Sequence, residues 1–222
     1  MSPRKTVSFA LTDPGQRRPH NEDSLLAEDS LGLYVGADGV GGRAKGEIAS
    51  AEAVEQVGMW VRRHLDEVDR ALDKGGAENL FKVCRVLETA VQQACYFVFG
   101  LAEQDPGKKG MSTTMSLLFV RKGHSFVAHV GDSRVYRLRE DGLFQLTEDH
   151  TLINYKLKHG LLTQEEAKTA PGRNVITRAV GTKEYVQVDI YDEQALAGDR
   201  YLLCTDGLYT YFEDPREIAA LM

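Results

Sequence analysis

Three aspartates stand at the ends of apolar segments in this chain. Asp38 follows LYVGA, Asp132 follows FVAHVG, and Asp206 follows RYLLCT. One such aspartate beside a glycine is a common turn signal, but three of them favour a shared carboxylate cluster. Clustered carboxylates repel one another unless cations lie among them. Ligand sets made only of oxygen favour Mg²⁺ or Mn²⁺ over zinc or copper.

An acidic pair strengthens the prediction of a cluster. Glu22 and Asp23 lie in RRPHNED, residues 17–23, just before a short strand candidate, and Arg18 precedes Glu22 by four residues. These residues would supply further carboxylates to the three aspartates if the strands bring them together.

A dinucleotide site is the alternative for the glycine-rich segment that follows Asp38. Residues 39–44 fit G-x-G-x-x-A. That fingerprint needs a second parallel strand after its helix and an acid about 20 residues further on. Here the helix that starts near residue 46 runs into a second helix, and Asp38 itself would repel a pyrophosphate. With a cation between them the repulsion becomes a bridge, so the segment favours a metal site.

Composition limits the function further. The chain has 222 residues and a net charge of −6, which disfavours a broad nucleic-acid-binding surface. No apolar run approaches the ~20 residues of a membrane span, and the first residues lack the apolar stretch of a secretory signal. The odd number of cysteines, Cys84, Cys95 and Cys204, without a CxxC pair is typical of buried thiols in a reducing cytoplasm.

The elements that must position the carboxylates follow from hydrophobic periodicity. Helices are predicted from 46 to 64, from 80 to 101, and from the Asp214-Pro215 cap onwards. The pattern between 148 and 174 is irregular and short-helical. Strands are predicted over 7–11, 25–27, 33–37, 113–120, 125–130, 134–139, 143–147, 186–191 and 200–204, with Asp141-Gly142 as a hairpin turn. Consecutive hairpins and a helix pair predict one α+β domain with antiparallel sheet.

Seven segments together resemble one family, the bacterial-type PP2C (PPM) metal-dependent protein serine/threonine phosphatases. They occur in family order with family spacing from residue 17 to residue 208. The segments are R-P-H-N-E-D at 18–23, A-D-G-V-G-G at 37–42, G-M-S-T-T at 110–114, V-G-D-S-R at 130–134, L-T-E-D-H-T at 146–151, R-N-V-I-T-R-A-V-G at 173–181 and C-T-D-G-L at 204–208.

The resemblance implies a fold and a metal site. Two central antiparallel sheets would be sandwiched between helix layers (α/β/β/α) in a domain spanning residues 1–222, with a flap at 151–172. Glu22, Asp38 and the Gly39 carbonyl would hold one metal. Asp38 would bridge to a second metal held by Asp206, and Asp132 with Asp206 would offer a third, weaker site.

The resemblance also implies a reaction. Two Mn²⁺ or Mg²⁺ ions would activate a bridging hydroxide that attacks phosphorus, with Asp38 and Arg18 as the catalytic residues. Arg18 would bind the substrate phosphate with its planar guanidinium, and Asp23 would hold waters around the metals. The substrates would be phosphoserine and phosphothreonine proteins made by a cognate kinase, and the enzyme would be a cytoplasmic monomer that binds no nucleic acid and has no membrane segment.

Two departures from the family pattern leave alternatives open. Val40 stands where many relatives have a histidine thought to act as general acid, and His20 and His150 are better read as surface or hydrogen-bonded histidines. The chain ends at Met222, before the family's G-G-x-D-N-x-T segment. We therefore expect the natural protein to continue, and the second metal site to be weak here. A catalytically impaired regulatory or binding module, or a hydrolase of another phosphoester, are the alternatives.

Overall fold

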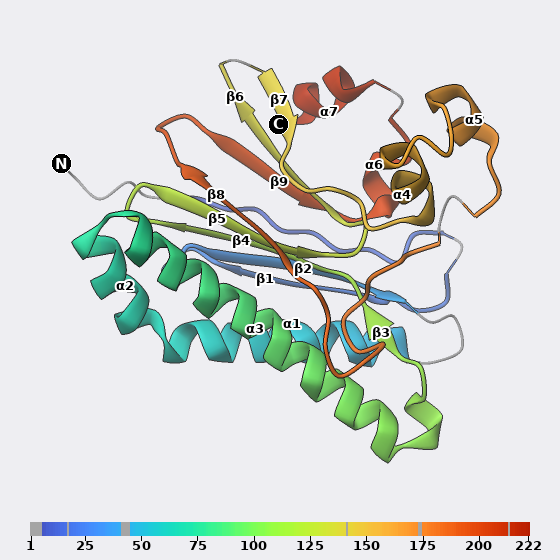
Figure 1. Cartoon of the computed structure of the whole chain (residues 1–222), viewed down its shortest axis with the longest axis horizontal. Coiled ribbons are helices and arrows are strands. Elements are labelled where there is room, and N and C mark those ends of the chain that lie inside the picture. The colour runs from blue at the N-terminus through green and yellow to red at the C-terminus, as the bar shows by residue number, and fades with distance from the viewer. Residues whose placement is uncertain (1–5, 17, 41–44, 141, 173–174, 213) are drawn as a thin grey trace.

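The computed structural model contains all 222 residues and describes residues 6–16, 18–40, 45–140, 142–172, 175–212 and 214–222 (Figure 1). The glycines at 41 and 42, the expected turn residue at 141 and residues 173–174 lie outside the described residues.

Two antiparallel sheets form the centre of the molecule. The larger sheet has the order β1-β2-β4-β5-β8 with β3 paired to β2, and the smaller has the order β7-β6-β9. The strands are β1 (Asp23–Glu28), β2 (Leu33–Val40), β3 (Ser112–Thr113), β4 (Met115–Arg121), β5 (His124–Val130), β6 (Arg134–Arg139), β7 (Gly142–Gln145), β8 (Asp189–Gln194) and β9 (Arg200–Cys204).

Helices cover one face of the larger sheet (Figure 1). α1 (Gly46–Arg63) packs along α3 (Ala77–Gln104), and α2 (Leu65–Lys74) connects them, so the expected helix pair is confirmed with one additional helix. α2 ends at Lys74, and the two glycines that follow it, Gly75 and Gly76, both have positive φ.

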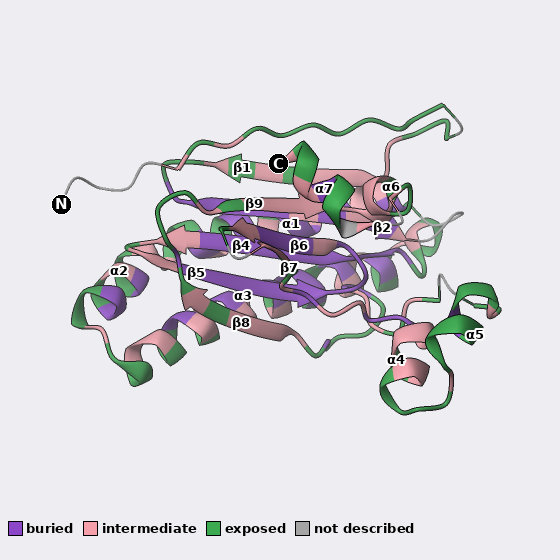
Figure 2. Cartoon of the chain, turned by 90° about the horizontal axis from the view of Figure 1, so that it is seen from above, coloured by how far each residue is buried: buried purple, intermediate pink, exposed green. Residues whose placement is uncertain are grey.

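Alternation along the central strands divides their side chains between two apolar layers. Leu33, Val35 and Ala37 of β2 face the helices, whereas Tyr34 packs with Val135 of the smaller sheet. The same alternation recurs in β4 and β5, because successive strand residues point to opposite faces. Figure 2 shows the resulting buried strands at the centre of the fold.

The remaining helices are short; η1 lies at the end of α3, and the others lie around the smaller sheet and its end. They are η1 (Pro106–Lys108), α4 (Leu152–Lys158), α5 (Gln164–Thr169), α6 (Asp206–Tyr209) and α7 (Pro215–Leu221). The Asp214 side chain accepts a hydrogen bond from the Arg216 amide at 2.9 Å, as the sequence predicts for the cap of α7. α7 lies beside β7, so the order helices, sheet, sheet, helix expected from the resemblance is confirmed.

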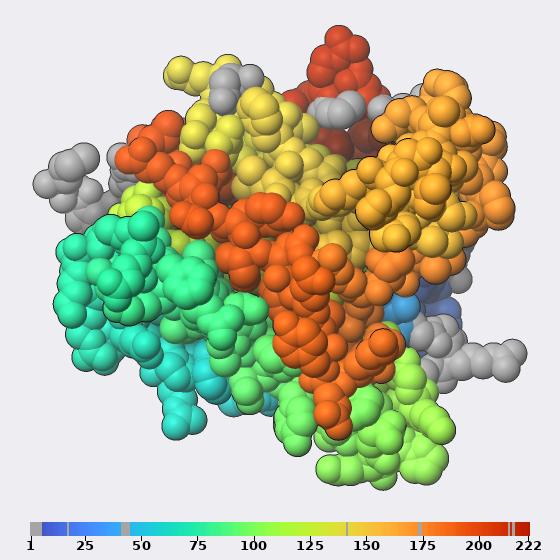
Figure 3. All heavy atoms as spheres, viewed as in Figure 1, coloured from blue at the N-terminus to red at the C-terminus, as the bar shows by residue number. Residues whose placement is uncertain are grey.

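The segment formed by residues 175–188, which precedes β8, extends to the helix layer, as Figure 3 shows in orange. It is fastened to α3 by Gln92, whose side chain donates to the Glu184 carbonyl at 3.0 Å and accepts from the Val186 amide at 3.3 Å. Val186 is buried in the helix-side core. β8 therefore begins at Asp189 and not at the predicted residue 186, because the valines there pack against helices instead of pairing in the ladder.

The strand predicted for residues 7–11 is wrong. These residues form no strand, and Val7, Phe9 and Leu11 are 64%, 96% and 91% exposed. The Ser8 amide donates to the Asp29 carboxylate at 3.3 Å, which holds the segment near the β1–β2 turn. An alternating pattern becomes a strand only where a ladder partner is available, and in the described part of the chain β1 pairs with β2 alone.

Candidate metal and phosphate site

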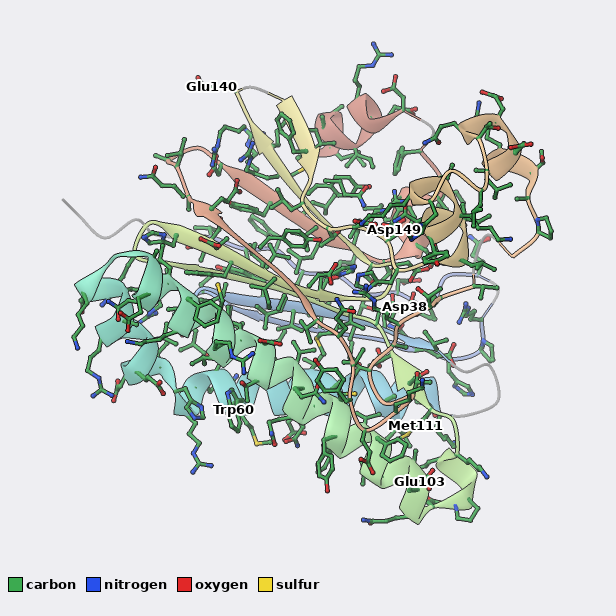
Figure 4. The ribbon with its side chains drawn as sticks, in the orientation of Figure 1. Asp38, Trp60, Glu103, Met111, Glu140 and Asp149 are labelled. Carbon is green, nitrogen blue, oxygen red and sulfur yellow. The ribbon has the colours of Figure 1, made fainter. Side chains whose placement is uncertain are left out.

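Four aspartates form what we call the acidic cluster: Asp23, Asp38, Asp132 and Asp206. Asp23 and Asp38 are directly opposite each other in the β1–β2 ladder, so their side chains share one face of the larger sheet. By alternation this face is the one that Tyr34 presents to the smaller sheet. The Thr205 hydroxyl donates to the Asp23 carboxylate at 3.2 Å, which brings in the end of β9 and the start of α6. Figure 4 shows Asp38 near that end of the sheets.

Burial and the charges within the acidic cluster raise the pKa of Asp23, Asp38 and Asp132. Burial raises the pKa of Asp38 to about 8, and the charges of Asp23, Asp206 and Asp132 act in the same direction. Burial and the charge of Asp206 raise the pKa of Asp132 to about 6. Burial also raises the pKa of Asp23, although hydrogen bonds with Thr205 and Asp38 oppose it. A divalent cation among these groups would relieve the repulsion.

Glu22 lies beside the cluster because the backbone approaches very closely there. The Gly39 amide donates to the Glu22 carbonyl at 3.0 Å. A Cβ at Gly39 would lie 2.4 Å from the Gly46 carbonyl group, and a Cβ at Gly46 would lie 3.1 Å from Glu22 Oε1. The two glycines therefore allow β2, the first turn of α1 and the Glu22 carboxylate to meet.

Arg18 lies at the exposed side of this site. Its guanidinium forms an ion pair with the Glu22 carboxylate, and 64% of its side chain is exposed. Its charge lowers the pKa of both Asp38 and Asp23, against the larger effect of burial. The expected phosphate-binding residue is thus close to the acidic cluster and open to solvent. The neighbouring arginine at position 17 lies outside the described residues.

Thr114, which the sequence analysis did not single out, connects the backbone at Asp38 with the segment that carries Asp132. The Asp38 amide donates to Thr114 Oγ1 at 2.9 Å, and the Thr114 amide donates to the Asp38 carbonyl at 2.9 Å. Thr114 Oγ1 also lies 2.8 Å from Ser133 Oγ, beside Asp132. Thr114 belongs to the motif G-M-S-T-T, which was the available signal.

Tyr209 was also missed, and it supports Asp132 from α6. Its hydroxyl donates to the Asp132 carbonyl at 2.9 Å, and the Arg134 guanidinium lies 3.6 Å from the centre of its ring. Arg134 in turn makes a two-pronged ion pair with Asp149. Arg134 and Asp149 belong to the motifs V-G-D-S-R and L-T-E-D-H-T. The motifs therefore indicated that these segments belong to the site, but they did not predict the contacts between them.

The donor set suits a hard divalent cation in its chemistry. It consists of carboxylate and carbonyl oxygens, Asp38 and Asp132 carry raised pKa values, and glycine backbone forms one wall. Within the described ranges, however, no three histidine, cysteine or acidic side chains converge as closely as the ligands of a metal ion do. The ion pair between Arg18 and Glu22 is one contact that the binding of a cation at Glu22 would have to break.

No histidine occupies the position from which the family's general acid would act. Val40 stands there, at the end of β2. His20 is exposed, as the surface reading predicted. His150 is buried and hydrogen-bonded, with Nε2 3.1 Å from an Asp189 oxygen. The alternative of a hydrogen-bonded histidine is therefore confirmed for His150.

The segment at 151–172 buries little of its surface. α4 contains no buried residue and α5 only Ala167, while Tyr155 and Leu161 are 54% and 64% exposed. The segment is closed at its base by a bridge between Thr151 and Ile176. The expectation of an irregular, short-helical segment is confirmed.

Comparison with known proteins identifies the arrangement. The family model "Protein phosphatase 2C" matches residues 16–222. Protein phosphatase PhpP of Streptococcus pneumoniae is 36% identical over 202 residues, which cover 89% of this chain and 77% of PhpP. These matches confirm the resemblance that the seven motifs carried.

Solved structures agree in fold. The serine/threonine phosphatase PstP/Ppp of Mycobacterium tuberculosis superposes with a TM-score of 0.79 at 33% identity, covering 96% of this chain and 83% of that one. The catalytic domain of PstP in complex with 2 manganese ions gives a TM-score of 0.75 at 33% identity, covering 95% and 82%. Among the described residues, no helix has the length and apolar character to cross a membrane.

Proposed function

The chain belongs to the protein phosphatase 2C family, and we propose that it hydrolyses phosphoserine and phosphothreonine esters in proteins with the help of divalent cations. The observation that supports this most strongly is the acidic cluster. Four partly or fully buried aspartates meet at strand ends, and the pKa of Asp38 is raised to about 8 there, so cations would stabilise the ionised carboxylates.

Each ligand has a proposed place. Glu22, Asp38 and the Gly39 carbonyl would hold one cation, and Asp38 and Asp206 would hold a second. Asp132 with Asp206 forms a third and weaker site. The ions are Mn²⁺ or Mg²⁺, and when bound they supply positive charge at the phosphate and activate water for attack on phosphorus.

The chain's own residues orient the ligands and the substrate. Asp23 takes its hydrogen bond from Thr205 and another from Asp38, so it would orient the Asp38 carboxylate toward the cations. Arg18 leaves Glu22 and binds two oxygens of the substrate phosphate, for which its exposed position and planar guanidinium suit it.

The substrate and setting follow from this activity. The substrates are phosphoproteins made by a cognate serine/threonine kinase, and the exposed segment at 151–172 contributes to the choice among them. The enzyme acts as a monomer in the cytoplasm, where the free thiols of Cys84, Cys95 and Cys204 stay reduced.

Release of inorganic phosphate from a phosphothreonine peptide tests the proposal. We expect release with Mn²⁺ or Mg²⁺ and none in EDTA, and an Asp38→Asn variant slower by several orders of magnitude. Equal release in EDTA would refute the metal mechanism. Binding of the peptide without any turnover in the presence of Mn²⁺ would support the alternative of an impaired binding module.

A further inference from the structure

The backbone just before Asp132 is held by two buried histidines. Gly131 has φ of +112°, and a Cβ there would lie 2.6 Å from the Thr114 side chain, so the position requires glycine. Its amide donates to His150 Nδ1 at 3.1 Å. Its carbonyl accepts from His129 Nε2 at 3.0 Å and from the His150 amide at 2.7 Å. We call this arrangement the Gly131 clamp.

The contacts of His150 assign its tautomer. Because Nδ1 accepts the Gly131 amide, the proton of the neutral ring must be on Nε2. Nε2–H then donates to Asp189 Oδ2 at 3.1 Å. Arg178 Nη1 also lies 3.1 Å from Nε2, but both are donors in this tautomer, so Arg178 donates to the other oxygen of Asp189 at 2.7 Å instead. Burial lowers the pKa of His150 and lowers that of His129 to about 3, so both rings are neutral at pH 7.

The Gly131 clamp acts on a cluster member directly. Asp132 is the next residue, and its own carbonyl accepts the Tyr209 hydroxyl at 2.9 Å. The backbone of Asp132 is thus held on both sides of its Cα. With its backbone held, Asp132 can move mainly by rotation of its side chain, whose carboxylate interacts with the charge of Asp206.

His150 also belongs to the base of the segment at 151–172. Its carbonyl accepts the Thr177 amide at 2.8 Å, beside the bridge between Thr151 and Ile176. The ring therefore extends from a well-paired part of the backbone, which makes it a firm support for the Gly131 peptide.

We propose that His150 is a positioning residue that holds the Gly131 peptide, and through it the Asp132 carboxylate, in place for a divalent cation. This rests on the proposed function, because only that proposal makes Asp132 a metal ligand. Groups that orient metal ligands from behind commonly change metal affinity by about 10- to 100-fold when they are replaced.

Two substitutions separate the two hydrogen bonds of the ring. In His150→Asn, Oδ1 takes the place of Nδ1 and still accepts the Gly131 amide, but the bond to Asp189 is lost. In His150→Gln, the amide reaches the position of Nε2 and can still donate to Asp189, but Gly131 loses its acceptor. His64 is the control, because its Nδ1 lies 2.9 Å from the Trp60 carbonyl in the helix layer, away from the cluster.

Mn²⁺ binding, followed by electron paramagnetic resonance of the free ion, is the main measurement. We expect His150→Gln to weaken the weakest class of Mn²⁺ sites about 10-fold, and His150→Asn and His64→Gln to stay within about twofold of the parent chain. In phosphopeptide hydrolysis, the kcat of His150→Gln should recover with excess Mn²⁺ while KM stays unchanged.

Equal Mn²⁺ affinity in both His150 variants and the parent would overturn the proposal. Equal losses in both would overturn it too, because they would assign the effect to ring packing. The imidazole ¹⁵N spectrum of the unaltered chain at pH 7 reports the tautomer of His150 without any substitution that could disturb folding. We expect the proton on Nε2, and a proton on Nδ1 would also contradict the assignment. If the parent chain binds Mn²⁺ without hydrolysing phosphopeptide and the variants still differ, only the proposed function fails.

Discussion

Replacing Asp38 by asparagine should make the metal-free protein more stable while it removes the activity. Asp38 is half-buried beside Asp23, Asp132 and Asp206, and its pKa rises from 3.8 to about 8. An acid whose pKa is raised on folding destabilises the folded state as the pH rises from its unfolded pKa to its folded pKa. In EDTA the loss of stability should therefore grow between pH 4 and pH 8.

The size of this effect follows from the same values. At pH 7 the pH exceeds the ordinary pKa of 3.8 by about 3 units, which corresponds to at most about 4 kcal/mol. Asparagine keeps the shape but retains the hydrogen bond with Asp23 only in part, so we expect a gain of about 1–3 kcal/mol. For a chain of this length the gain raises the melting temperature by roughly 3–10 °C.

Thermal unfolding in EDTA and in Mn²⁺ is the assay. Added Mn²⁺ should stabilise the unaltered chain by mass action and leave Asp38→Asn almost unchanged. Asp192 of β8 is exposed, so Asp192→Asn is the matched control and should change neither result. A melting temperature for Asp38→Asn in EDTA that is below that of the unaltered chain would refute the reasoning, because it would show that the cluster is not repulsive.

Three further predictions concern single side chains. Gly39→Ala should destabilise the chain by about 1–3 kcal/mol or more in urea unfolding, since its Cβ would meet the Gly46 backbone, whereas Gly36→Ala in the same strand meets nothing within 4 Å and should be far milder. Arg18→Ala should raise KM for phosphopeptide about 10-fold or more without weakening Mn²⁺ binding. Arg70 is also exposed, so Arg70→Ala is the control and should leave KM unchanged. An equally unchanged KM in Arg18→Ala would contradict the role of Arg18 in phosphate binding. Asp69→Asn should lower the free energy of unfolding by about 1 kcal/mol at pH 7, because Arg121 donates two hydrogen bonds to this carboxylate and lowers its pKa. The loss should vanish as the pH falls below 3.8 and through the lower pKa of the folded state. A loss of stability that persists in acid would show that packing, and not the charge, is responsible.

The positions of the main carboxylates could be predicted because they depend on local patterns. Apolar runs that end in aspartate identify strand ends, and antiparallel pairing then places Asp38 opposite Asp23. The sheet face of each residue obeys the same local alternation, which in the structure sends Val35 to the helices and Tyr34 to the smaller sheet.

What the sequence could not predict depends on partners that are distant in the chain. The alternation at residues 7–11 is as regular as that of a real strand, but no ladder partner meets it in the described chain. His150 looks like many other histidines until the fold brings Gly131 and Asp189 to its two ring nitrogens. Thr114 likewise gains its contact with Asp38 only through the sheet, across 76 residues of sequence.

The most direct test of the central claim measures bound Mn²⁺ and phosphate release in the same samples during one titration. If the acidic cluster holds the cations that drive hydrolysis, both quantities should rise together in the unaltered chain. In Asp38→Asn the loss of tight Mn²⁺ binding should accompany the loss of phosphopeptide hydrolysis. Hydrolysis that proceeds before any Mn²⁺ is bound, or that persists in Asp38→Asn at the rate of the unaltered chain, would contradict the account.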